Sequence, residues 1–217
     1  MSHGASESGE PARRLERGID TLGLPLTAGQ RQRLLAYLAL LRKWNRVYNL
    51  TAVREPADMV TRHLLDSLTA LPHVHGPRLL DVGSGAGLPG IPLAIAQPAL
   101  EVVVLDSVAK KTRFLNQAVA ELGLGNVTVV SSRVELYRPQ EGFHTITSRA
   151  MTTVAELLDL TRPLIRPGGQ WLLLKARDPG QELRDLPHDC GVAGLHPVTV
   201  PGLRGQRHII RIRQNPR

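Results

Sequence analysis

Apolar residues recur at helical spacing in the first third of the chain. A Thr-x-x-Gln capping box, formed by Thr27 and Gln30, precedes the first apolar stripe. That stripe consists of Leu34, Leu38, Leu41 and Tyr48. A second stripe begins after Pro56, a residue that suits the first turn of a helix, and stops at Pro72. It consists of Val60, Leu64, Leu68 and Leu71. The pattern predicts two amphipathic helices.

The pattern changes near residue 78, where short apolar runs replace the stripes. The runs predict strands at RLLDVG (78–83), EVVVLD (101–106), NVTVV (126–130), FHTITSRA (143–150), GGQWLLLKA (168–176) and RHIIRIR (207–213). Helical segments, at 108–122 and 153–164 among others, separate them. Alternating strands and helices indicate a mostly parallel sheet covered on both faces. The stretch 177–203, rich in Pro, Gly and Asp, predicts no particular element.

The chain ends and the bulk composition narrow the class of protein. Residues 1–12 are rich in Ser, Gly and Glu and predict a disordered tail, and 15–22 predicts a short helix that ends near Gly23. Among 217 residues the net charge is +8, which favours a polyanionic partner such as nucleic acid, although a charged surface also serves solubility alone. A single cysteine, Cys190, excludes an internal disulfide and suits a reducing cytoplasm. No apolar run reaches the length of a membrane span, so we expect no membrane partner.

A glycine-rich turn follows the first predicted strand. Glycines at 83, 85, 87 and 90 allow a sharp turn and the close approach of a ligand. Asp106 ends the second strand, 23 residues after Gly83, where a carboxylate can accept hydrogen bonds from ribose hydroxyls. The alternative role for Asp106 is to cap the helix that starts near Ser107. Strand, spacing and turn together favour the nucleoside site.

The same turn matches the dinucleotide pattern G-x-G-x-x-G over residues 85–90, which alone suggests NAD or FAD. Gly83 extends it to G-x-G-x-G after Asp-Val, the form typical of S-adenosylmethionine sites. Pro89 and Pro92 also crowd the helix start, where a pyrophosphate needs free N–H groups. S-adenosylmethionine is therefore the favoured cofactor, and an NAD-dependent oxidoreductase is the alternative.

Longer motifs point to one family. They are KWNRVYNLTAVREP (43–56), RHLLDSL (62–68), DVGSGAGLPGIPLAI (81–95), LDSVAKKTRFL (105–115), SSRVE (131–135), SRA (148–150) and LLLKA (172–176). With these motifs the chain resembles the ribosomal RNA small subunit methyltransferase G family. The resemblance implies a Rossmann-like methyltransferase fold with a mostly parallel seven-stranded sheet, an antiparallel C-terminal strand and an N-terminal helical extension. Composition and hydrophobic pattern divide the chain into a tail (1–12), a basic helical extension (13–75) and a methyltransferase domain (76–217).

The resemblance also implies a reaction: methyl transfer from S-adenosylmethionine to N7 of guanine 527 in 16S rRNA. Guanine N7 carries a lone pair and no proton, so the reaction needs positioning and desolvation more than a general base. We expect no metal, a cytoplasmic location and a monomer that acts on 16S rRNA or on the small subunit. The alternatives are methyl transfer to another RNA or to a small molecule.

The predicted cofactor contacts, most of them carried over from the family, are Gly83, Gly85, Gly87, Leu88, Asp106, Val134, Glu135 and Arg149. Arg149 follows the fourth strand and is the candidate that orients cofactor or target; a structural ion pair is its alternative role. His144 stands where relatives often carry Asp, so no role of that carboxylate is transferred.

Basic and polar residues supply candidates for RNA contact, with a solvated or packed surface as the alternative for each. They are Arg42, Lys43, Arg46, Tyr48, Asn49, Arg54, Lys110, Lys111, Arg113 and Lys175. His63 and Asp66 share a helical turn, and we expect them to form a hydrogen bond within that helix.

Overall fold

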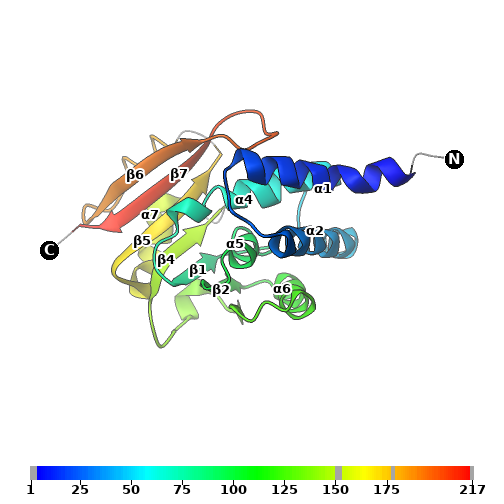
Figure 1. Cartoon of the computed structure of the whole chain (residues 1–217). Helices are drawn as coiled ribbons and strands as arrows, with labels where there is room; N and C mark the ends of the chain where they lie inside the picture. The colour runs from blue at the N-terminus through cyan, green and yellow to red at the C-terminus, as the bar shows by residue number, and fades with distance from the viewer. Residues whose placement is uncertain (1–3, 150–152, 177–178, 216–217) are drawn as a thin grey trace.

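A seven-stranded sheet forms the centre of the computed structural model, which describes residues 4–149, 153–176 and 179–215 (Figure 1). The strands are β1 (Arg78–Val82), β2 (Glu101–Asp106), β3 (Val127–Ser131), β4 (Phe143–Ser148), β5 (Ile165–Lys175), β6 (Cys190–Val198) and β7 (Arg207–Gln214). Their order is β3-β2-β1-β4-β5-β7-β6. The pairs among β1 to β5 are parallel, and β7 is antiparallel to both of its neighbours. The predicted fold class is confirmed.

Helices precede and separate the strands. They are α1 (Gly4–Thr21), α2 (Ala28–Tyr48), α3 (Pro56–Met59), α4 (Asp66–Leu68), α5 (Gly90–Ala96), α6 (Ala109–Leu122) and α7 (Val154–Thr161). A π-helical turn, η1 (Val60–Leu65), joins α3 to α4, and short 3-10 turns lie at η2 (Leu71–His73), η3 (Val134–Leu136) and η4 (Arg162–Leu164). The capping box of Thr27 and Gln30 starts α2 as predicted, with both reciprocal hydrogen bonds present.

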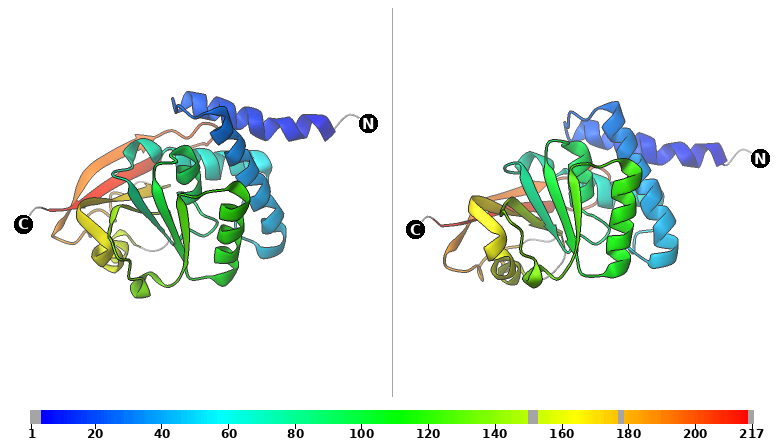
Figure 2. Two further views of the ribbon diagram at one scale, coloured as in Figure 1. Left: turned by 60° about the horizontal axis from the view of Figure 1, so that its bottom comes forward. Right: turned by 90° about the horizontal axis from the view of Figure 1, so that it is seen from below.

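The two faces of the sheet carry separate apolar cores, because neighbouring residues of a strand point to opposite faces. Leu79 of β1 packs with α1, α2, α5 and α6, whereas the adjacent Leu80 packs with α7. Trp171 and Leu172 of β5 divide in the same way. Figure 2 shows α2 and α6 side by side on the first of these faces. The N-terminal helices therefore share one core with the sheet.

The N-terminus departs from the prediction. Helix α1 begins at Gly4, so the expectation of a disordered tail over 1–12 is wrong from residue 4 onward; residues 1–3 lie outside the described part. Leu15 and Ile19 of α1 are fully buried, and Glu10 and Arg14 form an ion pair one turn apart at 2.8 Å. Burial of the later turns anchors the helix, and the earlier turns extend from that anchor because propagation is easier than nucleation.

The stretch 177–203 also contains an element that its composition does not predict. Within the described residues, strand β6 lies at the edge of the sheet and pairs with β7. Its Gly191, Gly194 and Pro197 obscure the strand pattern in the sequence, and pairing along β7 overrides their low strand propensity. Strand β4 ends at Ser148, and Ala150 of the predicted strand lies outside the described residues. The division into a helical extension and a methyltransferase domain stays a prediction.

Candidate functional site

The glycine turn connects β1 to α5 at the carboxyl end of the central strand. Gly83, Gly85 and Gly87 have φ values of +64°, +62° and +86°, a region that residues with a Cβ rarely adopt. The Ser84 N–H donates to the carbonyl oxygen of Leu105 at 3.0 Å, which ties the turn to β2. The sequence needs glycine here because the backbone turns in a left-handed conformation.

Asp106, at the end of β2, is bound to the glycine turn and to the segment that precedes α6. Its Oδ2 accepts from the Gly85 N–H, and its Oδ1 accepts from the Val108 N–H just before α6, both at 2.9 Å. The ammonium group of Lys111 lies 3.4 Å from Oδ2. Asp106 therefore ties the glycine turn to the segment before α6. Val108 is the N-cap residue of α6 and makes no side-chain cap bond, so the helix cap considered as the alternative role of Asp106 is not formed. Binding of ribose hydroxyls by Asp106 stays a prediction.

A pocket of about 360 Å³ opens beside this carboxylate. Its lining comes from the carboxyl ends of β1, β2 and β3 and from α7, and comprises Gly83, Leu105, Asp106, Ser107, Val108, Lys111, Ser132, Arg133, Val134, Glu135 and Leu160. Four predicted cofactor residues, from three strand ends, thus meet in one pocket: Gly83, Asp106, Val134 and Glu135. An acidic acceptor opposite apolar Val134 suits a nucleoside, which has hydroxyl groups on one side and a flat ring on the other.

Three further predicted cofactor residues serve the turn itself. Gly85 donates its N–H to Asp106. A Cβ on Gly87 would lie 2.5 Å from Cγ1 of Ile91, so this glycine allows α5 to pack against the turn. The Leu88 side chain is 4% exposed and belongs to the core. None of the three is in the lining of this pocket, and direct cofactor contact by their backbones stays a prediction.

Asp81, which the sequence analysis did not single out, is a fully buried carboxylate beneath the turn. Its Oδ2 accepts from the Gly90 N–H at 2.8 Å, while Oδ1 is buried and has no hydrogen-bond partner among the residues that the structure describes. Burial raises the pKa of Asp81 to about 7. A buried acceptor without a partner is uncommon and favours a cationic or donor group nearby. This feature and the glycine turn fit a cofactor that carries positive charge.

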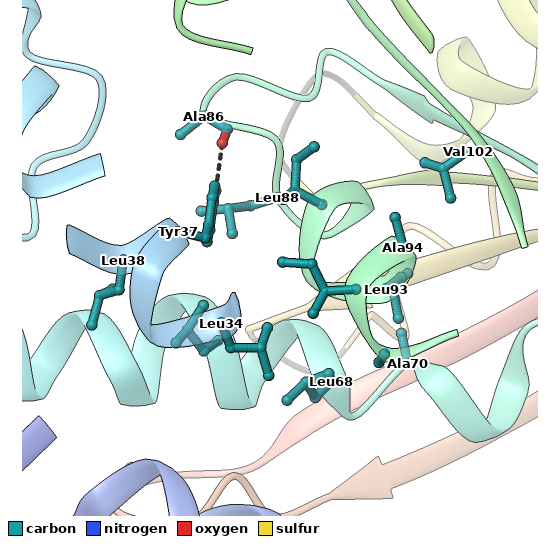
Figure 3. Close-up of a cluster of buried hydrophobic side chains, with 14 of the residues drawn as sticks. Leu34, Tyr37, Leu38, Leu68, Ala70, Ala86, Leu88, Leu93, Ala94 and Val102 are labelled. Carbon is teal, nitrogen blue, oxygen red and sulfur yellow. Dashed lines mark hydrogen bonds between the residues drawn. The ribbon is translucent and has the colours of Figure 1, made fainter. Parts of the chain in front are cut away.

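Tyr37 links the N-terminal helices to the same turn. Its hydroxyl donates to the carbonyl oxygen of Ala86 at 2.5 Å, from the buried face of α2 (Figure 3). Burial raises the pKa of the hydroxyl, which keeps the proton available for this bond. The residue lies one position before Leu38 of the predicted stripe, so its sequence context predicts packing but not the partner.

Arg149 is the predicted contact nearest the end of β4. Its Nη1 donates to the carbonyl oxygen of Arg62 at 3.1 Å and lies 3.8 Å from Oδ2 of Asp66. The structural ion pair considered as its alternative role is therefore present. Asp66 also accepts from Nε of Arg207, at 3.1 Å. A role for Arg149 toward cofactor or target stays a prediction.

The expected hydrogen bond between His63 and Asp66 is present between backbone groups, where the Asp66 N–H donates to the His63 carbonyl oxygen, but the two side chains have other partners. Nε2 of His63 instead pairs with Oγ1 of Thr51 at 2.9 Å, and the Asp66 carboxylate turns to the two arginines. The physical reason is that a charged guanidinium is a stronger partner for a buried carboxylate than a neutral imidazole. Burial lowers the pKa of His63 to about 4, so the imidazole is neutral near neutral pH.

The predicted RNA contacts fall into several groups. Arg42, Arg46 and Arg54 line one pocket of about 220 Å³ together with Asn45 and Met59, none of them acidic. Lys43, Lys110 and Arg113 are exposed on α2 and α6.

The remaining candidates have partners within the chain. Asn49 adopts φ +47° at the end of α2 and accepts from Arg54, and Tyr48 stacks on Trp44. Lys111 faces the cofactor pocket, and Lys175 pairs with Glu182 at 2.7 Å. RNA contact stays a prediction for every residue in both groups. In the described part of the chain, no helix has the length and apolar character needed to cross a bilayer.

Comparisons with known proteins agree on the family. A family model described as rRNA small subunit methyltransferase G matches residues 30–210. A relative named "Ribosomal RNA small subunit methyltransferase G" from Chromohalobacter salexigens is 54% identical over 201 residues, which cover 93% of this chain and 96% of the relative. A protein of the same name from Laribacter hongkongensis is 52% identical, over 91% of this chain and 96% of its own length.

Solved structures show the same fold at low sequence identity. The glycopeptide N-methyltransferase MtfA, complexed with S-adenosylmethionine, superimposes with a TM-score of 0.60 at 15% identity, over 71% of this chain and 95% of MtfA. The O-methyltransferase TomG from Streptomyces achromogenes, also in complex with S-adenosylmethionine, gives a TM-score of 0.55 at 18% identity, over 83% of this chain and 90% of TomG.

Proposed function

Because the chain belongs to the rRNA small subunit methyltransferase G family, we propose that it transfers a methyl group from S-adenosylmethionine to N7 of a guanine in 16S rRNA. The observation that carries the proposal is the pocket at the strand ends, where Asp106, Val134 and the glycine turn meet. The N7 position comes from the family resemblance and is the part that experiment must decide. A ribosomal substrate implies action in the cytoplasm.

Residues in and near this pocket suit the ribose, the adenine ring and the charged groups of the cofactor. Asp106 offers carboxylate oxygens for the ribose hydroxyls, and Val134, 5% exposed, offers an apolar surface for the adenine ring. The positively charged sulfonium and ammonium groups would favour the ionised form of the Asp81 carboxyl, whose pKa burial raises to about 7. When bound, S-adenosylmethionine supplies an electrophilic methyl group on a sulfonium.

The chain's own contribution to the reaction is geometric. The N7 lone pair forms the new N–C bond, the C–S electron pair stays on sulfur, and the positive charge moves to the purine ring. No proton leaves the reacting atoms, so a general base is unnecessary. Rigid anchoring of the turn, by Tyr37 on one side and Asp106 on the other, holds the donor for in-line attack. Arg149, beside Asp66, orients cofactor or target.

The RNA-binding surface that we propose lies on α2, on the loop after it and on α6. Arg42, Arg46 and Arg54 surround one pocket without an acidic neighbour in its lining, an arrangement that suits a phosphate group. Lys43, Lys110 and Arg113 add exposed positive charge on the two neighbouring helices α2 and α6. Since A-form RNA buries N7 in a deep, narrow groove, the target guanine should lie in a loop or leave its stack.

Transfer of a labelled methyl group to small-subunit particles and to free 16S rRNA tests the reaction. Nuclease digestion and nucleoside analysis should identify 7-methylguanosine as the labelled product. An Asp106→Ala variant is the matched negative control, because its fold should persist while its cofactor site is damaged. Label in another nucleoside would refute the N7 assignment, and label only in a small molecule would refute the RNA substrate.

A further inference from the structure

Arg149 follows β4 at the same edge of the sheet as the glycine turn. Thr147 of β4 is the register partner of Asp81 of β1, and Arg149 and Gly83 each follow this pair by two residues at the carboxyl edge of the sheet. Its side chain is only 26% exposed and reaches the Arg62 carbonyl and the Asp66 carboxylate. A positive charge is therefore held at the border between the glycine turn and the N-terminal helices.

Asp66 places a buried negative charge against that guanidinium. Its side chain is 9% exposed, and its two oxygens face different arginines: Oδ2 faces Arg149 and Oδ1 accepts from Arg207. The π-helical turn η1 ends immediately before Asp66 and presents the Arg62 carbonyl and the Asp66 carboxylate to the same guanidinium. Such turns occur frequently at functional sites.

The positive charge of Arg149 affects the pKa values of titratable groups near the glycine turn. It opposes the burial-driven rise in the pKa of Asp66 and of Asp81, and it adds to the lowering of the pKa of His63. An isolated cation at this place would act against a cationic methyl donor. It would act much less on the product S-adenosylhomocysteine, whose sulfur is neutral.

We propose that Asp66 is a positioning residue that holds Arg149 and neutralises it, so that the pocket accepts the cationic donor in preference to the neutral product. The inference rests on the proposed placement of the cofactor beside Arg149. It assigns a function to a carboxylate that contacts neither the pocket of Asp106 nor the proposed RNA surface. The pair therefore serves catalysis by limiting product inhibition, besides joining η1 to β4.

Calorimetric titration of four proteins with three probes tests the proposal: wild type, Asp66→Asn, Arg149→Gln and Asp20→Asn. The probes are S-adenosylmethionine, S-adenosylhomocysteine and sinefungin, an analogue with a protonated amine in place of the methylated sulfonium. The readout is the ratio of the Kd for S-adenosylmethionine to the Kd for S-adenosylhomocysteine. Asp20→Asn is the matched control, because Asp20 pairs with Arg31 at 2.8 Å on the surface, away from the pocket.

Opposite charge changes should shift the ratio in opposite directions. Asp66→Asn leaves Arg149 uncompensated and should raise the ratio roughly tenfold, the effect of one charge about 12 Å away at an effective dielectric constant of about 20. Arg149→Gln removes the cation and should lower the ratio, even if both affinities fall. The Kd for sinefungin should change in the same direction as the Kd for S-adenosylmethionine, because both ligands carry a positive charge at this position although their groups differ in size. Asp20→Asn should leave the ratio unchanged.

Equal weakening of both ligands by Asp66→Asn, or a raised ratio in Arg149→Gln, would overturn the proposal. If Asp66→Asn fails to fold because Arg207 loses its partner, Arg149→Gln still shows whether the charge of Arg149 raises or lowers the ratio of the two Kd values. Failure of the wild type to bind either ligand would instead contradict the proposed cofactor site. The two failures are therefore distinguishable.

Discussion

Two buried titratable side chains, Asp81 beneath the cofactor turn and His63 in η1, have pKa values shifted in opposite directions. Burial raises the pKa of Asp81 from 3.8 to about 7 and lowers the pKa of His63 from 6.5 to about 4. In both cases burial disfavours the charged form. Their effects on stability therefore oppose each other in nearly the same range of pH.

The signs lead to a prediction about stability and pH. Between about pH 4 and 7, folded Asp81 keeps a proton that the unfolded chain has released, so its contribution makes the folded state less stable as pH rises. Between about pH 4 and 6.5, the unfolded chain protonates His63 and the folded chain does not, so its contribution is lost as pH falls. In the wild type the two slopes should largely cancel.

Single substitutions should reveal each slope. In Asp81→Asn the free energy of unfolding should rise with pH between about 4 and 6.5, by roughly 1.4 kcal/mol per pH unit. In His63→Gln it should fall over about the same range. Urea denaturation at several pH values measures both slopes. Identical pH profiles for the wild type and both variants would contradict the assigned shifts.

Asp106 offers a second prediction at the scale of one residue. Asp106→Ala should weaken binding of S-adenosylhomocysteine by about 1–3 kcal/mol, because a buried charged hydrogen-bond acceptor is lost from the pocket. Calorimetry measures the change. Asp159→Ala is the matched control: this carboxylate pairs with Arg162 on the surface and should leave the affinity unchanged. Unaltered affinity in Asp106→Ala would remove the residue from the site.

At the scale of elements, the geometry of the glycine turn depends on how closely α5 approaches the sheet. Helix α5 begins at Gly90, whose N–H donates to Asp81. A Cβ added at Gly90 would lie 2.8 Å from Oδ2 of Asp81 and 2.8 Å from Cγ1 of Val104. The absence of a side chain therefore lets the helix start directly against β1 and β2, which sets the geometry of the turn.

Gly90→Ala should consequently destabilise the protein by about 1–3 kcal/mol, the usual cost of forcing atoms into a packed interior. Cofactor affinity should fall as well, because the shift displaces Asp81 and the turn. Gly125→Ala is the matched control, since a Cβ there meets no atom within 4 Å and the residue lacks a positive φ. The free energy of unfolding of Gly125→Ala should differ from that of the wild type by less than about 0.5 kcal/mol. Thermal and urea denaturation compare the two variants.

At the scale of the whole molecule, the net charge is +8, and part of the positive charge lies on the proposed RNA surface. Helix α2 carries Arg42 and Arg46 near its end, and on its buried side Tyr37 binds the cofactor turn. One helix thus adjoins both the proposed RNA phosphates and the cofactor. With the proposed RNA surface and cofactor site, this helix would place RNA and methyl donor close to each other.

The salt dependence of RNA binding tests this surface. Each lost phosphate contact should reduce the slope of log affinity against log salt by about 0.7–0.9. Substitution of Arg42, Arg46 and Arg54 by Gln should therefore lower the slope by about 2 to 3 if each meets a phosphate. Arg33→Gln, an exposed arginine earlier on α2, is the matched control. Filter binding over a range of salt measures the slope, and an unchanged slope in the triple variant would reject the surface.

The sequence alone determined the features that depend on neighbours close along the chain. The capping box of α2 and the glycine turn could be predicted because local hydrogen bonds and φ values decide them. The alternation of strands and helices likewise identified the sheet, and the family motifs identified four residues of the pocket. Residues close along the chain carried the signal for the local features, whereas the pocket residues were carried over from the family resemblance.

The tertiary structure decided which distant groups meet. The bond from Tyr37 to Ala86 joins residues 49 positions apart, and Arg207 reaches Asp66 across 141 positions. Strand β6 exists through its pairing with β7, and the shifted pKa values of Asp81 and His63 arise from burial by several elements. Burial and long-range partners are properties of the packed molecule, so no local pattern of residues contains them.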